Sequence, residues 1–287
     1  MLASRSRLTL PEILRRSRTG LRLVDTGYGG AETAEAPVPS REVLRLETAA
    51  EELVPSHADV GSWLDAVCAA VRRSSAVAVK TIAAYRASLR LRPPPPAELP
   101  SAYRALRRQE RPRLAGDTLC HALLRRAAGE CARLERPLQV HCGLGDPDED
   151  LAESSPLGLR PLLTEPGFEG LRVVLLHCYP YHREAAYLCS VYPNVWMDLS
   201  LAVPLAGLDA RRAMAETLGL CPWSKLLYAS DASRLPEMYL VASLQYREAL
   251  AGGFGELVAA GAVDLAQAES AGRQVLAGNA RGLYGLE

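Results

Sequence analysis

The chain has 287 residues with 33 basic and 33 acidic side chains, so its formal net charge at pH 7 is zero. Nucleic-acid and anionic-membrane binding depend on a surplus of Lys and Arg near phosphates, and this balance argues against both partners. No stretch approaches the ~18–20 consecutive apolar residues that a membrane span needs. We therefore expect a soluble protein without a nucleic-acid or membrane partner; the sequence leaves homo-oligomer formation open.

The seven cysteines are odd in number and include no Cys-x-x-Cys pair. This pattern gives no indication of a disulfide framework or of a cysteine zinc site. Reduced thiols of a cytoplasmic protein are the expected state.

Seven short apolar runs alternate with longer segments rich in Ala, Leu and Arg. Runs of this length are typical of buried strands, and the longer segments are typical of helices. In chain order the runs are Leu21–Val24, Val43–Leu46, Ala76–Val79, Pro137–Val140, Leu171–Leu176, Asn194–Met197 and Lys225–Ser230.

Between the runs lie segments long enough for crossover helices, namely Gly61–Ser74, Asp117–Leu134, Tyr181–Tyr192 and Asp209–Leu218. Alternation of strand and helix predicts parallel βαβ units of the α/β class, with the helices outside. We expect one domain over residues 1–287, because α/β barrels reach this length as a single unit.

Other stretches fall outside the alternation. The proline block Arg92–Pro100 predicts a loop, and we treat residues 92–116 as a proline-rich insertion. The Arg-rich start of the chain predicts an amphipathic helix, the tail from Pro236 predicts two or three helices, and Gly29–Ser40 is a candidate for disorder.

The strand-like runs share one property, which is that an ionisable residue follows each of them. Parallel strands would place these residues on one face, which in a barrel is the carboxyl-terminal rim where active sites are built. The residues are Asp25, Glu47, Lys80, His141, His177, Asp198 and Asp231.

Two histidines and one aspartate of this set suit a metal site. His141 precedes a Gly-Leu-Gly turn, His177 ends the most apolar run, and Asp231 follows a half-buried one. Two neutral imidazoles and a carboxylate suit a borderline divalent ion such as zinc, with Asp231 also accepting a proton from the attacking water. The alternatives are structural: core histidines bonded to backbone carbonyls, and an aspartate that caps a helix.

Lys80, Glu47 and Arg86 are the candidates for substrate binding. A strand-end lysine is either a salt-bridge partner for Glu47 or Asp25, or a functional group. Arg86 could hold a substrate carboxylate with two parallel hydrogen bonds, although a chain so rich in arginine offers many structural uses for one.

Several whole phrases of the sequence resemble the amidohydrolase superfamily of metal-dependent TIM-barrel enzymes, in its amidohydrolase-2 branch. The closest likeness is to the amidohydrolase-like half of FluG and of nodulin/glutamine synthetase fusion proteins. The phrases are Val79–Arg86, Gln139–Asp146, Ser155–Pro161, Leu175–Pro180, Ala202–Pro204, Tyr228–Asp231 and Asn279–Tyr284.

The resemblance implies a (β/α)₈-type barrel in which His141 and His177 bind metal and Asp231 is both ligand and general base. Members of the family also carry a His-x-His pair on their first strand, and this chain has none. With seven runs, the barrel is expected to lack its first strand unit. Either the reading frame is truncated, or Met1–Ser17 caps the gap in a protein that has lost chemistry.

Three functions follow. The first is metal-dependent hydrolysis of an amide or other C–N bond in a small carboxylate-bearing substrate. The second is non-oxidative decarboxylation on the same scaffold. The third is a metal-free, non-catalytic binding protein, which the absent His-x-His pair would favour.

Overall fold

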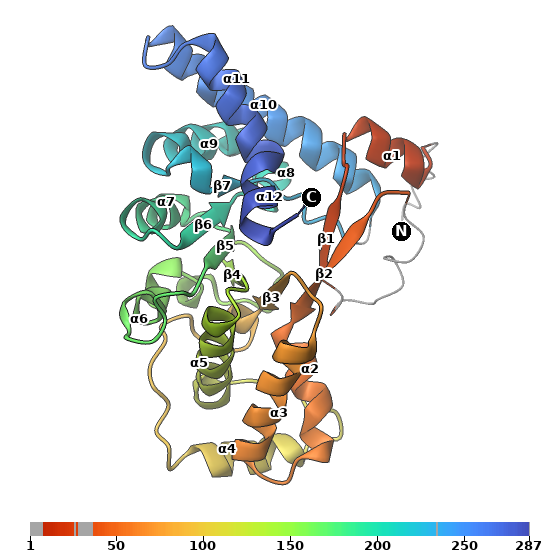
Figure 1. Cartoon of the computed structure of the whole chain (residues 1–287), viewed down its shortest axis with the longest axis vertical. Helices are drawn as coiled ribbons and strands as arrows, with labels where there is room; N and C mark the ends of the chain where they lie inside the picture. Colours follow the sequence, from red (N-terminus) through yellow and green to blue (C-terminus); the bar gives the residue numbers. More distant parts are fainter. Residues whose placement is uncertain (1–7, 26, 28–36, 234, 287) are drawn as a thin grey trace.

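The computed structural model describes residues 8–25, 27, 37–233 and 235–286. Within this part, seven parallel strands form one sheet in the order β1-β2-β3-β4-β5-β6-β7, curled into a half-barrel (Figure 1). This confirms the α/β prediction and the seven strands. The strands are β1 (Arg22–Asp25), β2 (Ser40–Arg45), β3 (Ala78–Thr81), β4 (Leu138–Cys142), β5 (Val173–His177), β6 (Val195–Asp198) and β7 (Leu226–Leu227).

The four expected crossover helices are present as α3 (Val60–Arg73), α5 (Asp117–Arg133), α7 (His182–Val191) and α9 (Asp209–Leu220). Their apolar faces cover the outer face of the sheet, as expected for parallel strands buried on both sides. The remaining α-helices are α1 (Leu10–Arg16), α2 (Leu46–Leu53), α4 (Leu99–Arg107), α6 (Arg160–Thr164), α8 (Ala202–Leu205), α10 (Glu237–Ala259), α11 (Leu265–Arg273) and α12 (Asn279–Tyr284).

Short helical turns complete the structure and include one π-helical turn between α11 and α12. The 3₁₀ turns are η2 (Val54–Ser56), η3 (Ala83–Tyr85), η4 (Leu151–Glu153), η5 (Pro156–Leu159) and η6 (Trp223–Lys225), and the π turn is η7 (Gln274–Gly278).

The proline-rich insertion is not wholly a loop. Helix α4 begins at Leu99 with Pro100 in its first turn and continues to Arg107. Proline is tolerated there because the first N–H groups of a helix have no intrahelical partner. The expectation of a loop over Arg92–Pro100 therefore holds for residues 92–98 and is wrong for Leu99 and Pro100, where α4 begins. Most of the stretch 29–40 named as a candidate for disorder lies outside the described residues.

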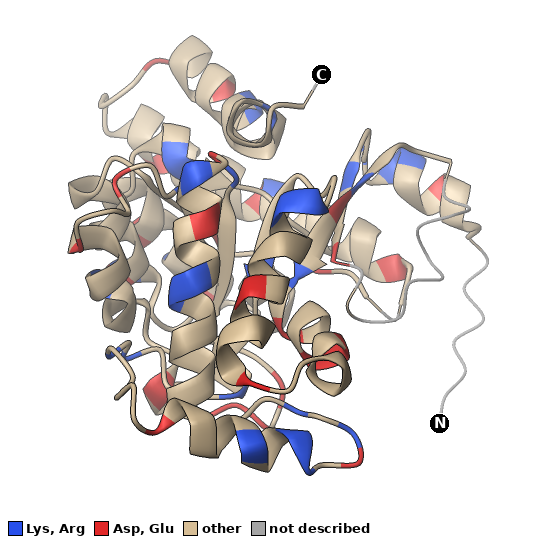
Figure 2. Cartoon of the chain, turned by 60° about the horizontal axis from the view of Figure 1, so that its bottom comes forward, with Lys and Arg blue, Asp and Glu red and all other residues tan. Residues whose placement is uncertain are grey.

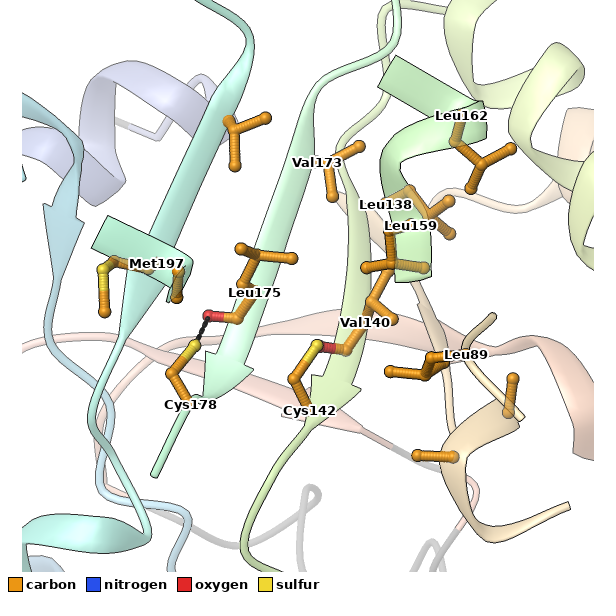
Figure 3. Packing of buried hydrophobic residues seen from close by; sticks show 14 of the residues in the cluster. Leu89, Leu138, Val140, Cys142, Leu159, Leu162, Val173, Leu175, Cys178 and Met197 are labelled. Carbon is orange, nitrogen blue, oxygen red and sulfur yellow. Dashed lines mark hydrogen bonds between the residues drawn. The ribbon is translucent and has the colours of Figure 1, made fainter. Parts of the chain in front are cut away.

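The two faces of the sheet bury different partners. Val173 and Leu175 belong to the large cluster shared with the outer helices, parts of which are shown in Figure 3. Val174 and Leu176 face the other way and pack with Leu227 and with Leu283 of α12. The alternation follows from the two-residue period of a strand, and it brings the last helix of the chain onto the inner face.

Helix α10 connects the two edges of the sheet. Its Tyr246 hydroxyl donates to the Leu227 carbonyl of β7 at 2.7 Å. Its Ser243 hydroxyl donates to the Ser17 carbonyl, immediately after α1, at 2.8 Å. Exposed strand edges invite pairing with other chains, and covering them is one common remedy. The described part of the segment 1–17, which was expected to cap the gap, contains α1, and this helix packs against α10.

Acidic and basic side chains are interspersed along the helices (Figure 2). Within the described part of the chain, no helix combines the length and the apolar character that a membrane crossing requires.

Candidate active site

The carboxyl-terminal ends of the strands form one rim, because all seven strands of the described sheet are parallel. Three strands end on residues of the predicted set, namely Asp25, His177 and Asp198, and His141 is the penultimate residue of β4. Asp231 follows β7 after three residues of irregular backbone. The pattern of an ionisable residue after each apolar run therefore predicted the position of the rim correctly.

His141 and His177 lie side by side at the centre of this rim. They come from neighbouring strands, and their ring centroids are 4.5 Å apart. Both are buried, at 3% and 2% exposure. The residues following His141 and His177 in the chain, Cys142 and Cys178, point into the core instead (Figure 3).

His177 is held through one ring nitrogen. Its Nδ1 lies 2.8 Å from Ser200 Oγ, and the Ser200 hydroxyl donates to Asp198 Oδ1 at 2.7 Å. Since that hydroxyl proton is committed to Asp198, Ser200 Oγ accepts from Nδ1–H, and Nε2 is left without a proton. Burial, followed by the charges of His141 and Lys80, lowers the pKa of His177 well below its usual value. The ring is therefore neutral near pH 7.

His141 is held through Nε2, whereas His177 is held through Nδ1. Its Nε2 lies 3.0 Å from Glu149 Oε2, and the Tyr85 ring packs beside it at an interplanar angle of 49°, with centroids 4.5 Å apart. The loop after β4 approaches closely here. A Cβ on Gly145 would lie 2.0 Å from the Glu149 carboxylate and 2.2 Å from the Tyr85 hydroxyl. A side chain at this position would displace the Glu149 carboxylate or the Tyr85 hydroxyl.

The backbone is strained at the rim. His177 and Asp231 have positive φ angles of 69° and 49°, in the left-handed region that non-glycine residues rarely adopt. Such strain is often found at functional sites, where the surrounding structure enforces it.

Asp231 does not cap a helix, because α10 begins six residues later with Pro236 at its N-cap. The residue is exposed at the rim. Desolvation by the surrounding walls raises the pKa of Asp231, the nearby Lys80 lowers it, and Asp198 raises it again. The net shift is upward, which makes the carboxylate a better proton acceptor than an ordinary aspartate.

Lys80 pairs with Asp25 and not with Glu47. Its Nζ lies 3.1 Å from Asp25 Oδ2, and Arg45 Nε donates to both oxygens of the same carboxylate at 3.1 and 3.0 Å. The side chains of Lys80 and Asp25 are 12% and 15% exposed. One of the two open interpretations of Lys80, a salt bridge, is therefore present, and two of its three N–H donors are not used by that contact.

No hydrogen bond or ion pair of the described residues joins Glu47 or Arg86 to the histidine pair. Glu47 is in the first turn of α2, and its two oxygens accept from the Thr81 hydroxyl at 2.5 Å and from the Ile82 N–H at 3.1 Å. Burial raises the pKa of this carboxyl. The Arg86 carbonyl accepts from the Gly116 N–H at 2.8 Å, and its side-chain Nε is buried without a described hydrogen bond. The geometry gives Glu47 a structural task, and substrate contact by either residue stays a prediction.

Comparison with known proteins identifies the family. The sequence profile of the amidohydrolase family matches residues 103–286, more than half of the chain. The chain belongs to the amidohydrolase family. This confirms the resemblance seen in the sequence.

Individual relatives of this chain agree with that result. Protein fluG of Emericella nidulans is 33% identical over 230 residues, which cover 76% of this chain and 26% of fluG. The chain thus spans about a quarter of that relative. A Lactobacillus casei protein assigned as a metal-dependent hydrolase is 35% identical, with a TM-score of 0.90 over 96% of this chain and 76% of its own. A uronate isomerase of Thermotoga maritima, 15% identical with a TM-score of 0.70 over 96% of this chain and 69% of its own, shares the fold.

The side chains at the rim are of the chemical types that bind a divalent ion, but their positions do not form a complete binding site. Each imidazole keeps one ring nitrogen free of a described hydrogen bond, and two carboxylates, Asp231 and Glu149, lie within electrostatic reach of the His141–Tyr85 pair. Yet among the described residues no three His, Cys, Asp or Glu side chains are placed around one point. A third ligand would have to move into place.

Three residues of the site were missed by sequence reasoning, namely Glu149, Tyr85 and Ser200. Glu149 stands in an acidic run that is typical of a solvated loop, and Tyr85 stands in a turn next to the more conspicuous Arg86. Ser200 follows Asp198 by two residues, and that spacing was the one available signal, because a serine there can bond an aspartate at the strand end.

Proposed function

We propose that this amidohydrolase hydrolyses an amide or other C–N bond in a small carboxylate-bearing substrate, using a divalent ion held by His141 and His177. One observation supports it above all, the side-by-side placement of these two imidazoles at the centre of the rim. Each ring is fixed through one nitrogen while the other is left for a ligand. Core histidines satisfied at both nitrogens would not show this pattern.

Asp231 is the proposed third ligand and proton acceptor. Its raised pKa lets the carboxylate take up a proton during attack, and Lys80 beside it stabilises the ionised form beforehand. When bound, the ion would activate a water molecule and polarise the bond to be cleaved. Zinc is the proposed metal, because imidazole and carboxylate are among its ordinary ligands.

Lys80 is the proposed anchor for the substrate carboxylate. It extends from β3 beside the histidine pair and keeps N–H donors beyond the Asp25 contact. An ammonium group binds such a carboxylate as a point charge, which sets the position of the substrate but not its full orientation. The name of the L. casei relative supports the metal-dependent hydrolase class without fixing the substrate.

The test is metal affinity and turnover of the full chain. We expect about one Zn²⁺ per chain, and His141→Ala and His177→Ala should each weaken binding by more than the roughly 10–100-fold that a supporting residue costs. His57→Ala is the matched control, because His57 bonds the Leu53 carbonyl away from the rim. Affinity should not change in that variant.

Substoichiometric zinc in the parent chain, or equal affinity in all three variants, would support the metal-free alternative and overturn the proposal. Turnover of a panel of carboxylate-bearing amides, scored for released amine and for carbon dioxide, separates hydrolysis from decarboxylation. Release of carbon dioxide alone would replace the hydrolase proposal by the decarboxylase one.

A further inference from the structure

Glu149 is a buried carboxylate that the loop after β4 delivers to the centre of the rim. Its side chain is 3% exposed, although its neighbour Asp148 in the same acidic run is 55% exposed. Loop carboxylates ordinarily remain in water, because removing them from it costs several kcal/mol. The burial of this one therefore needs a cause.

The cause lies in the contact with His141. Glu149 Oε2 is 3.0 Å from His141 Nε2, and the absence of a side chain on Gly145 makes room for the carboxylate beside Tyr85. In the described structure no Lys or Arg pairs with Glu149, and its Oε1 is buried without a hydrogen bond. Stability of the loop alone does not explain a carboxylate placed in this way.

A positive charge on or behind His141 would offset that cost. Histidines that bind metals commonly donate their second ring N–H to a carboxylate, which fixes the tautomer and the ring orientation. The Glu149 contact occupies Nε2 and leaves Nδ1 for a ligand. His177 is arranged in the opposite sense, with Nδ1 held by Ser200 and Nε2 left free.

We propose that Glu149 is the positioning residue of His141, accepting a hydrogen bond from Nε2–H so that Nδ1 is presented to the divalent ion. Ser200, backed by Asp198, performs the same task for His177. This inference rests on the proposed metal site and adds to it a residue from outside the strand ends.

The first experiment uses the parent chain alone. In metal-free protein labelled with ¹⁵N-histidine, at a pH at which the imidazole is neutral, the ring nitrogen shifts of His141 should report the Nε2–H tautomer. A variant of Glu149 that fails to fold cannot disturb this measurement. A His141 ring carrying its proton on Nδ1 would overturn the proposal.

The second experiment measures Zn²⁺ affinity by competition with a chromophoric chelator. Glu149→Ala should weaken binding by about 10–100-fold, and Glu149→Gln, which keeps an acceptor but no charge, should fall between Glu149→Ala and the parent. The visible spectrum of bound Co²⁺ should change in Glu149→Ala, because the ligand ring is no longer fixed. Asp148→Asn is the matched control and should equal the parent.

The outcomes separate the two proposals. Parent-like affinity in both Glu149 variants, with affinity lost in His141→Ala, would overturn only the assignment of Glu149. Parent-like affinity in His141→Ala would overturn the proposed metal site itself. An equal loss in Asp148→Asn would show an effect of loop charge in general and would also overturn the positioning role.

Discussion

The ends of β4 and β5 carry two imidazoles whose nitrogens are only half used, whereas the ends of β1, β2 and β3 carry three charged side chains that satisfy one another. In the first half of the rim, Glu149 and Ser200 each hold one ring nitrogen. In the second half, the Asp25 carboxylate accepts from Arg45 and pairs with Lys80. The two halves share one edge of the sheet and differ in what they leave open.

The difference indicates a division of labour. A group held at one atom and free at another is prepared to bind a ligand, and its support keeps it in place. Charged side chains that pair with one another contribute to stability. They leave few hydrogen-bonding groups for a ligand, apart from the remaining N–H donors of Lys80. We therefore expect substitutions in the imidazole half to change metal affinity, and substitutions in the charged half to change stability.

Asp25→Asn should give the largest effect. Removing one partner of a buried ion pair costs about 3–5 kcal/mol, and at 15% exposure of Asp25 we expect about 2–3 kcal/mol, measured by urea unfolding at pH 7. Zn²⁺ affinity should stay within about threefold of the parent, a small change beside the 10–100-fold of a lost imidazole support. Asp65→Asn, which breaks an exposed pair with Arg126, is the control and should cost about 0–1 kcal/mol.

The Asp25 effect should depend on pH. Burial raises the pKa of this carboxyl, but Lys80 and Arg45 lower it more, so that the folded value lies below the ordinary value. A carboxyl with a depressed pKa contributes stability above the unfolded pKa of about 3.9, and this is lost as pH falls through the folded pKa. The difference between parent and variant should therefore be constant near neutrality and shrink in acid. A difference that grows in acid would contradict the assignment.

Ser200→Ala tests the imidazole half. Without the hydroxyl, His177 Nδ1 loses its acceptor and the ring loses its fixed orientation, so Zn²⁺ affinity should fall by about 10–100-fold. The free energy of unfolding should fall by only about 1 kcal/mol, the usual value of one hydrogen bond. Chelator competition and urea unfolding give the two quantities.

Ser190→Ala serves as the control for Ser200→Ala, because Ser190 is an exposed serine on α7 that bonds the Tyr187 carbonyl. Unchanged affinity in Ser200→Ala, or an Asp25→Asn variant that loses as much affinity, would remove the distinction between the two halves.

The sequence predicted the strands and the strand-end residues well, because both depend on local patterns. Runs such as Leu171–Leu176 are apolar enough to identify a buried strand, and a parallel sheet places all strand ends on one side. The same sequence pattern therefore identified His141, His177 and Asp231 as residues of one rim. The last run gave only a two-residue strand, since Lys225 lies in η6 and donates to the Cys189 and Tyr192 carbonyls.

The supports of the site could not be predicted in the same way. Glu149 reaches His141 in a loop where Gly145 leaves room for the carboxylate beside Tyr85, and nothing in the acidic run distinguishes this residue from Asp148. Glu47 differs from the other residues of the set only in the element that carries it. It follows an apolar run, but β2 ends at Arg45, and the side chain two positions later enters a helix and bonds β3. The Glu47 carboxylate therefore reaches the carboxyl end of β3 from a helix and not from a strand end of its own.

Tyr85→Phe should give the smallest effect and shows where the two halves meet. Tyr85 lies in η3, just after the charged strand β3, yet its ring packs on His141. Its hydroxyl accepts from the Asp146 N–H at 3.0 Å. Phenylalanine keeps the ring contact and loses that hydrogen bond, so we expect about 0.5–1 kcal/mol of stability lost and little change in Zn²⁺ affinity. Tyr181→Phe, which loses a hydroxyl bonded to the Leu151 carbonyl, is the control for hydroxyl removal. The contradicting outcome is that Tyr85→Phe alone weakens Zn²⁺ binding by about tenfold, as much as the loss of a residue that supports a metal ligand. In that case the β4 loop, and not the Tyr85 ring, would fix the orientation of His141. Tyr85 would then belong to the imidazole half of the rim.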